Sequence, residues 1–339
     1  MGLALLASAV LILLIALGSR GFADFDSALI GYAVGTVFAV AAVTYRYALW
    51  VTTRPPTRRY FRAGWASFLS WDNFRRYATL VPAALWRDIL AQTFIRERSA
   101  RRWIMHLCIF WGVVLSCLIT FPLTFGWFHF TLVPPTSYEL WFFGLPIFRF
   151  PIQAGTGFIL FHALDFTALL LIVGLAIALW RRVSDVGLLA TQRFAFDLLP
   201  LVLLFAIAVT GLALTASYTW WQGRFYSFLS LTHEVTVVGW LLSLPFGKFF
   251  HVVERPASIG VTLYQTVSQE GPTAGLRCRR CQRELPSRRF IDDLKTTLRE
   301  LGQDYELGEG LGSLQDYCPT CKRTLRGEAY YQLMGRRFL

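Results

Sequence analysis

Long apolar runs alternate with basic polar segments over the first three quarters of the chain. A helix that crosses a bilayer needs about 20 mainly apolar residues. We expect six such helices, in residues 3–18, 27–50, 103–125, 152–180, 194–218 and 225–255. The first run lacks the basic start and the clear cleavage site of a signal peptide, so we interpret it as an uncleaved span. The pattern predicts an all-α polytopic membrane protein.

The remaining segments are polar or mixed. Residues 53–101 interleave aromatic residues with arginines, which is typical of helices that lie in the lipid headgroup layer. The alternative for this segment is a docking surface for a cytoplasmic partner. The chain therefore divides into two N-terminal spans (1–52), an interfacial region (53–101), a four-helix domain (102–255) and a polar tail (256–339).

Composition and charge agree with this interpretation. The chain is 55% hydrophobic and only 16% charged, which excludes an ordinary soluble domain. The net charge of +12 is concentrated in two segments: residues 54–102 hold eleven arginines and residues 255–337 hold fourteen Lys or Arg. Basic loops of membrane proteins stay in the cytoplasm. We therefore expect both segments and both termini on the cytoplasmic side, and no nucleic-acid partner.

The last apolar run carries two histidines, His233 and His251, eighteen residues apart. In a continuous α-helix this spacing is five whole turns, so both imidazoles would share one face about 27 Å apart. Two neutral nitrogen ligands at different depths predict two haems stacked across the membrane.

Depth pairs these histidines with two others. His106 and His251 each lie four residues inside a boundary arginine, roughly 6 Å below the cytoplasmic surface. His162 and His233 lie roughly 16 and 13 Å from the outer boundary. We expect His106 and His251 to ligate an inner haem and His162 and His233 an outer one. The alternative is that these histidines are polar residues satisfied by hydrogen bonds within the bundle.

The haem type and the quinone contacts follow from smaller signals. Covalent haem c needs Cys-x-x-Cys-His, and neither Cys281 nor Cys321 is followed by His, so haem b is expected. Asp165 and Glu234 are the polar candidates for a quinone site, although either could simply bond a neighbour. We expect His129, in the loop of residues 126–150, to be an ordinary interfacial histidine, with a contact to quinone as the alternative.

The run RDILAQTFIRERSARRWIMHLCIFWGVVLSCLITF, from Arg87, together with His233 and His251, resembles the respiratory nitrate reductase gamma-subunit family. That family includes the membrane subunits of heterodisulfide-reductase-like complexes. The resemblance covers roughly residues 85–255 and implies a dihaem cytochrome b in a bacterial or archaeal cytoplasmic membrane, with an iron–sulfur or other redox partner in the cytoplasm. By this resemblance, His106, His233 and His251 correspond to three of the family's haem ligands. The family's fourth ligand would fall near Ser116 and Cys117, so His162 takes that role by depth alone.

The tail contains two C-x2-C motifs, Cys278 with Cys281 and Cys318 with Cys321. Two such pairs predict one four-thiolate metal site. Zinc in a small zinc-ribbon-like domain is favoured because arginines surround the cysteines, with iron or an iron–sulfur cluster as the alternative. Two disulfides are disfavoured by the cytoplasmic placement.

These patterns predict an electron-transfer subunit of a quinone-linked oxidoreductase complex. The competing class is a non-redox membrane protein, such as a transporter or an assembly factor with a zinc-binding tail. A protein with one haem is the third hypothesis.

Overall fold

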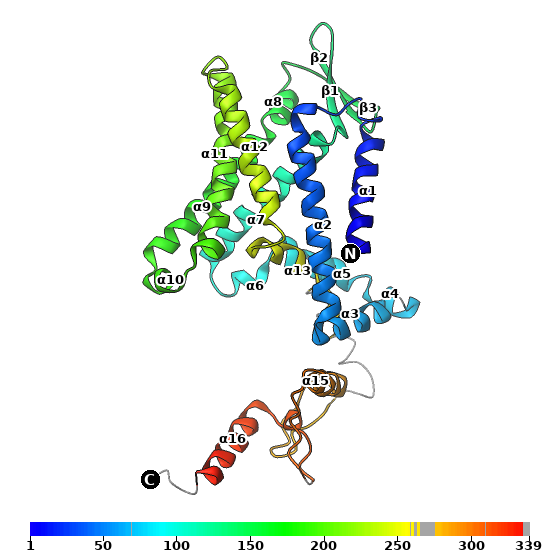
Figure 1. The fold of residues 1–339 in the computed structure, drawn as a ribbon, viewed down its shortest axis with the longest axis vertical. Coiled ribbons are helices and arrows are strands. Elements are labelled where there is room, and N and C mark those ends of the chain that lie inside the picture. The colour runs from blue at the N-terminus through cyan, green and yellow to red at the C-terminus, as the bar shows by residue number, and fades with distance from the viewer. Residues whose placement is uncertain (69, 258, 261–262, 265–274, 309, 335–339) are drawn as a thin grey trace. The chain divides into compact units, whose positions relative to one another are not determined.

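The computed structural model describes residues 1–68, 70–257, 259–260, 263–264, 275–308 and 310–334, and they form mainly helices (Figure 1). The chain divides into two compact units. Unit 1 comprises Met1–Ala48 and Arg87–Glu254, and unit 2 comprises Leu49–Trp86 and Arg255–Leu339. The interfacial region and the tail predicted from the sequence thus largely share unit 2.

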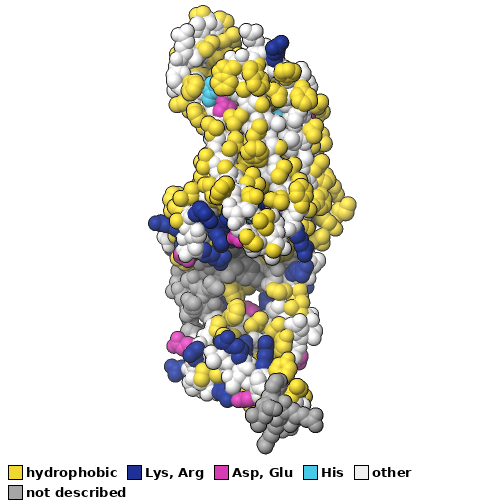
Figure 2. Space-filling view, turned by 90° about the vertical axis from the view of Figure 1, so that its left-hand side faces the viewer, with side chains coloured by type: hydrophobic (Ala, Val, Ile, Leu, Met, Phe, Trp, Pro, Cys, Tyr) yellow, Lys and Arg dark blue, Asp and Glu magenta, His cyan; other side chains and the backbone are white. Residues whose placement is uncertain are grey.

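Four helices among the described residues are long and apolar enough to cross a membrane: Ser27–Thr53, Ala100–Thr124, Ala163–Ser184 and Phe194–Thr219. They correspond to α2 (Ile30–Thr53, preceded by the 3-10 turn η1, Ser27–Leu29), α7 (Ala100–Thr124), α9 (Ala163–Ser184) and α11 (Leu199–Thr219, preceded by the π-helical turn η3, Phe194–Leu198). The bundle carries a broad apolar surface (Figure 2), as expected for side chains that face lipid. The chain is a membrane protein by this criterion.

The predicted number of six spans is wrong, for two physical reasons. Helix α1 (Gly2–Gly18) has 17 residues and a length of about 26 Å, less than the roughly 30 Å of a hydrocarbon core. The last run is not one helix. A fifth span exists only if its two bent parts are counted together.

The last apolar run breaks where the sequence predicted five continuous turns. Helix α12 (Tyr226–Ser243) is followed, after a turn, by η4 (Lys248–Phe250) and α13 (His251–Glu254), bent by 67° from it. Proline cannot supply the N–H that a helix interior needs, and Pro245 lies in this turn. The expectation that His233 and His251 project from one face of a single helix is therefore wrong.

An arginine from α2 holds the break in place. The guanidinium of Arg46 donates a hydrogen bond to the carbonyl of Pro245 and lies 4.1 Å from the ring centroid of Phe250. Pro245 and Phe250 are both buried. Lys248 forms a second contact, an ion pair in which its Nζ lies 2.7 Å from the Asp197 carboxylate in η3. The bend is thus fixed by contacts on two sides.

Glycines bring α7 and α9 into backbone contact. A Cβ on Gly112 would lie 2.9 Å from the Cα of Leu171, and a Cβ on Gly174 would lie 2.8 Å from the backbone nitrogen of Ile109. Small residues permit such close approach of membrane helices. The hydroxyls of Ser116 and Thr167 add a hydrogen bond of 2.8 Å across the same pair.

We expect Gly174→Ala to destabilise the protein by about 1–3 kcal/mol, because the added methyl meets backbone atoms that cannot move aside. The measurement is the thermal midpoint of the detergent-solubilised chain. Gly239→Ala is the matched control, since a Cβ there meets nothing within 4 Å. Equal midpoints for the two variants would contradict a tight crossing.

Residues 128–151 form a small antiparallel sheet, so the prediction of an all-α fold is corrected. Strands β1 (Phe128–Val133), β2 (Ser137–Phe142) and β3 (Leu145–Pro151) pair in the order β1-β2-β3. The register sets His129 opposite Trp141 and Glu139 opposite Arg149. Aromatic residues suit the pleated surface. The sheet and α8 (Gly155–Phe161) lie at one end of the bundle, whereas α6 (Thr93–Arg96), α10 (Val186–Thr191) and α13 lie at the other (Figure 1).

Unit 2 joins the segment after α2 to the tail. Its helices are α3 (Pro55–Phe68), α4 (Trp71–Tyr77), α5 (Leu80–Ala84), α15 (Arg288–Glu300) and α16 (Pro319–Leu333), with the 3-10 turn η5 (Leu314–Asp316) between the last two; the π-helical turn η2 (Leu85–Leu90) spans the boundary with unit 1. Helix α3 contacts α15 through ion pairs. Glu300 accepts hydrogen bonds from Arg58, at 3.1 Å, and from Arg59. The tail is therefore tied to the segment that follows α2.

Candidate histidine and cysteine sites

Four cysteines of the tail converge on one point. The sulfurs of Cys278, Cys281, Cys318 and Cys321 all lie within 4.8 Å of one another. They come from two turns that the sequence separates by about 40 residues, one before α15 and one at the start of α16. A closed set of four thiolates is the donor set of a structural zinc site. The predicted four-cysteine cluster is confirmed, and it is arranged to hold a metal ion such as zinc.

Backbone N–H groups stabilise negative charge on these sulfurs. The N–H of Cys318 donates to Cys278 Sγ at 3.3 Å and that of Cys321 donates to Cys318 Sγ at 3.5 Å. Burial disfavours the Cys278 thiolate, but N–H groups of Cys281, Cys318 and Arg280 outweigh it and lower the pKa of this thiol to about 6. Burial and the neighbouring sulfurs raise the pKa of Cys321. Four crowded sulfurs can all be thiolates only when a cation compensates their charge.

The cysteine cluster is the core of a small domain. Cys278, Cys318 and Cys321 are buried together with Tyr317, and Leu285, Leu307 and Leu325 pack around them. Asp316 connects the cluster to α15, because its carboxylate lies 2.8 Å from Lys295 Nζ. Few apolar side chains contribute, so a metal ion bound here would supply much of the folding free energy of this small domain.

His162 lies at a break between two helices. It follows α8 directly and precedes the first residue of α9. Its Nδ1 donates a hydrogen bond of 2.8 Å to Asp165 Oδ2. The other oxygen of Asp165 accepts from the hydroxyl of Thr215, on α11, at 2.8 Å. Asp165 therefore orients the imidazole and ties α9 to α11.

His233 of α12 contacts α11 as well. The hydroxyl of Thr210 donates to the carbonyl of Ala206 at 2.6 Å, so its oxygen accepts the hydrogen of His233 Nδ1, 2.9 Å away. A Cβ on Gly211 would lie 3.4 Å from the imidazole. Thr210 and Thr215 are five residues apart on one helix, a rise of about 7.5 Å. Helix α11 thus links His162, through Asp165, with His233.

Glu234, the second quinone candidate, lies against α2. A Cβ on Gly31 of α2 would lie 2.1 Å from Glu234 Oε1, so the carboxylate packs against the helix at this glycine. Gly35, one turn further on α2, faces Leu241 and Val238 of α12 in the same way. The two glycines let α2 approach α12 closely.

His106 is oriented by a residue that the sequence did not single out. Gln92 precedes α6 with a φ of +50°, a left-handed conformation that is uncommon for a residue with a side chain, and it is 4% exposed. Its Oε1 accepts the hydrogen of His106 Nδ1 at 2.6 Å. A buried polar side chain in a strained backbone indicates a constraint beyond packing.

His251 is the first residue of α13, on the far side of the break in the last run. Its Nδ1 donates a hydrogen bond to the carbonyl of Lys248. Helix α13 and helix α6, which precedes His106, lie at the same end of the bundle, opposite the sheet (Figure 1). The structure thus places His106 and His251 at that end and His162 beside α8 at the sheet end.

All four histidines share one hydrogen-bonding pattern. Each Nδ1–H meets an acceptor: Gln92 Oε1 for His106, Asp165 Oδ2 for His162, Thr210 Oγ1 for His233 and the Lys248 carbonyl for His251. This assignment puts the lone pair of each neutral ring on Nε2. Histidines that ligate a metal are usually held in this way. The pattern is compatible with metal ligation at Nε2 and equally with polar residues that are satisfied by hydrogen bonds within the bundle.

His129 is different. It lies on β1, stacked against Trp141 with ring centroids 5.9 Å apart. Its Nδ1 is buried and has no hydrogen-bond partner among the described residues, and the nearest carboxylate oxygen, of Asp24, is 3.8 Å away. This histidine packs within the sheet end.

Comparison of the chain with models of known protein families, with curated protein sequences and with solved structures finds no match.

Proposed function

We propose that this protein is a membrane dihaem cytochrome b that moves electrons between a quinone pool and a partner subunit of an oxidoreductase complex. The observation that carries the proposal is the shared hydrogen-bonding pattern of four histidines in or beside apolar helices, each with Nδ1–H bonded to an acceptor. Polar groups inside a membrane are costly, so four such arrangements favour a function over mere packing.

The histidines have distinct roles in this proposal. His106 and His251 would hold an inner haem b, and His162 and His233 an outer one. Haem b supplies one-electron redox chemistry when it is bound. Gln92, Asp165 and Thr210 keep the imidazoles in the Nδ1–H tautomer and fix the direction of Nε2.

Quinone is the proposed membrane-soluble redox substrate. Asp165 and Glu234 are the carboxylates near the outer histidines. Both oxygens of Asp165 are already hydrogen-bonded, which favours an orienting role for this residue.

The tail is proposed to bind zinc at Cys278, Cys281, Cys318 and Cys321 as a structural ion, with iron or an iron–sulfur cluster as the alternative. A cytoplasmic redox subunit would dock on the tail's side of the membrane. The basic tail would face the cytoplasm of a bacterial or archaeal cell, as the placement of basic residues predicts.

An optical spectrum tests the proposal. The purified chain should show a b-type α-band in the reduced-minus-oxidised difference, with two haems per chain. His162→Ala should lose about half of the haem and keep the band of the other half. Retention of both haems in His162→Ala would mean that the outer ligand is another residue.

A chain without any b-type band would instead favour a non-redox membrane protein with a metal-binding tail. If the wild-type chain contains only one haem, only one of the two proposed histidine pairs binds haem. Metal analysis of the purified chain separates zinc from iron in the tail.

A further inference from the structure

The loop between α11 and α12, residues 220–225, has a fixed conformation at the end of two apolar helices. The hydroxyl of Ser217, which is fully buried, donates to the carbonyl of Arg224 at 2.6 Å. The N–H of Gly223 donates to the carbonyl of Ser217 at 2.9 Å. These bonds close the loop on the last turn of α11 and hold its backbone in one conformation.

Three aromatic side chains of this loop are strongly exposed. Trp220 is 75% exposed, Phe225 70% and Trp221 47%. Such exposure in water leaves a large apolar area unburied. Tryptophan at the end of a membrane span is instead favourable, because its ring sits in the headgroup layer and its N–H finds a polar partner there. The loop therefore has the composition of a lipid contact.

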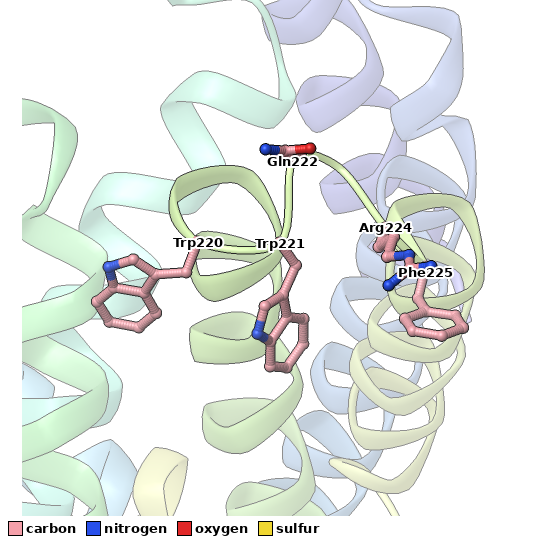
Figure 3. A pocket seen from close by; sticks show the side chains of 5 residues that line it. All are labelled: Trp220, Trp221, Gln222, Arg224 and Phe225. Carbon is pink, nitrogen blue, oxygen red and sulfur yellow. The ribbon is translucent and has the colours of Figure 1, made fainter.

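The loop also forms a pocket of about 610 Å³, lined by Trp220, Trp221, Gln222, Arg224 and Phe225. Figure 3 shows the two indoles projecting beside the end of α11 and Arg224 with Phe225 at the start of α12, with Gln222 between them. Arg224 is the charged residue among the five that line the pocket. Its planar guanidinium can donate two parallel hydrogen bonds to a phosphate, and the Gln222 amide and the indoles are further donors.

The start of α12 favours a negative charge at the same place. Phe225 precedes the helix and offers no side-chain acceptor to the first N–H groups. The positive end of the helix dipole adds to the attraction of Arg224 for an anion.

We propose that this pocket binds the phosphate headgroup of an anionic phospholipid, with Arg224 on the phosphate and the rings of Trp220, Trp221 and Phe225 at the acyl boundary. The anion chemistry comes from Arg224 and the start of α12. The lipid, rather than a soluble phosphate, is favoured by the exposed rings and by the two apolar helices that flank the site. The proposal does not depend on haem.

The test uses the full chain in nanodiscs that contain equal amounts of phosphatidylglycerol and phosphatidylcholine. Lipids that remain bound after release into mild detergent are counted by native mass spectrometry. Wild type should retain phosphatidylglycerol in preference to phosphatidylcholine. Arg224→Gln should weaken this retention about tenfold, because a charge-assisted hydrogen bond is lost.

Arg149→Gln is the matched control, because this exposed arginine of β3 is not part of the pocket lining. It should retain the lipid as wild type does. Arg224→Lys keeps the charge and loses the bidentate geometry, so it should give an intermediate retention and guards against a misfolded Gln variant.

Three results would overturn the proposal. They are wild-type retention in Arg224→Gln, equal loss in Arg149→Gln, and displacement of the lipid by soluble glycerol 3-phosphate or by a short-chain quinone. Haem content can be read from the same samples by absorbance, so failure of the lipid site and failure of the cytochrome assignment remain distinguishable.

Discussion

Replacing Cys278 by serine should empty the four-cysteine site and unfold the tail domain while the membrane helices stay folded. Cys278 is fully buried and its sulfur accepts the N–H of Cys318, so the change removes both a metal ligand and the centre of a small core. Structural zinc contributes on the order of 10–16 kcal/mol in small zinc domains. The few leucines around the cluster cannot replace that contribution.

The measurements are metal content after gel filtration and limited proteolysis. We expect about one metal ion per wild-type chain and almost none in Cys278→Ser. Protease should cut the variant within residues 275–333. Cys117→Ser is the control, because Cys117 lies on α7 outside the cluster. A metal-free tail that resists protease as well as wild type does would show that the cysteines are held by packing alone.

Single and double histidine variants should reveal which residues share a haem. His106→Ala and His251→Ala should each remove about half of the haem, and the double variant should remove the same half. His106→Ala combined with His233→Ala should remove all of it. The reason is that loss of either axial ligand disrupts one low-spin site, so a second loss at that site adds nothing.

The readout is haem per chain together with the low-spin signals in electron paramagnetic resonance. His129→Ala should keep both haems, since this histidine lies on β1 against Trp141. Complete haem loss in the double variant of His106 and His251 would refute the pairing. Full haem content in either single variant would show that the substituted histidine is not a haem ligand.

The long apolar helices were predictable because hydropathy over some 20 residues reports directly on burial in lipid. The four-cysteine cluster was predictable for a similar reason, since two C-x2-C motifs have few other structural uses in a cytoplasmic tail. The predicted metal ligands Cys278 and Cys318 do meet in space although 40 positions separate them.

The breaks were not predicted, since they depend on tertiary contacts. Pro245 in an apolar run is compatible with a kink, a break or a span that simply ends there. The outcome here depends on Arg46, which lies some 200 positions away and binds the Pro245 carbonyl. The sheet of residues 128–151 was missed because its aromatic content was interpreted as an interfacial loop.

The residues that orient the histidines also could not be predicted from the sequence. Gln92, Thr210 and Thr215 are ordinary polar residues in their local patterns. Their roles come from hydrogen bonds to His106, His233 and Asp165 on other elements. A threonine pair within an apolar span is the signal that could have drawn attention to α11, since hydroxyls in such spans often bond across helices.

The crossing of α7 and α9 at Gly112 and Gly174 bears on how the protein responds to its bilayer. Helix α7 carries His106 near one end of the bundle, and α9 carries Asp165 near the other. Backbone atoms in direct contact cannot slide past one another without a steric clash. We therefore expect the two helices to tilt together when the bilayer thickness changes, which would keep the separation of the two polar ends constant.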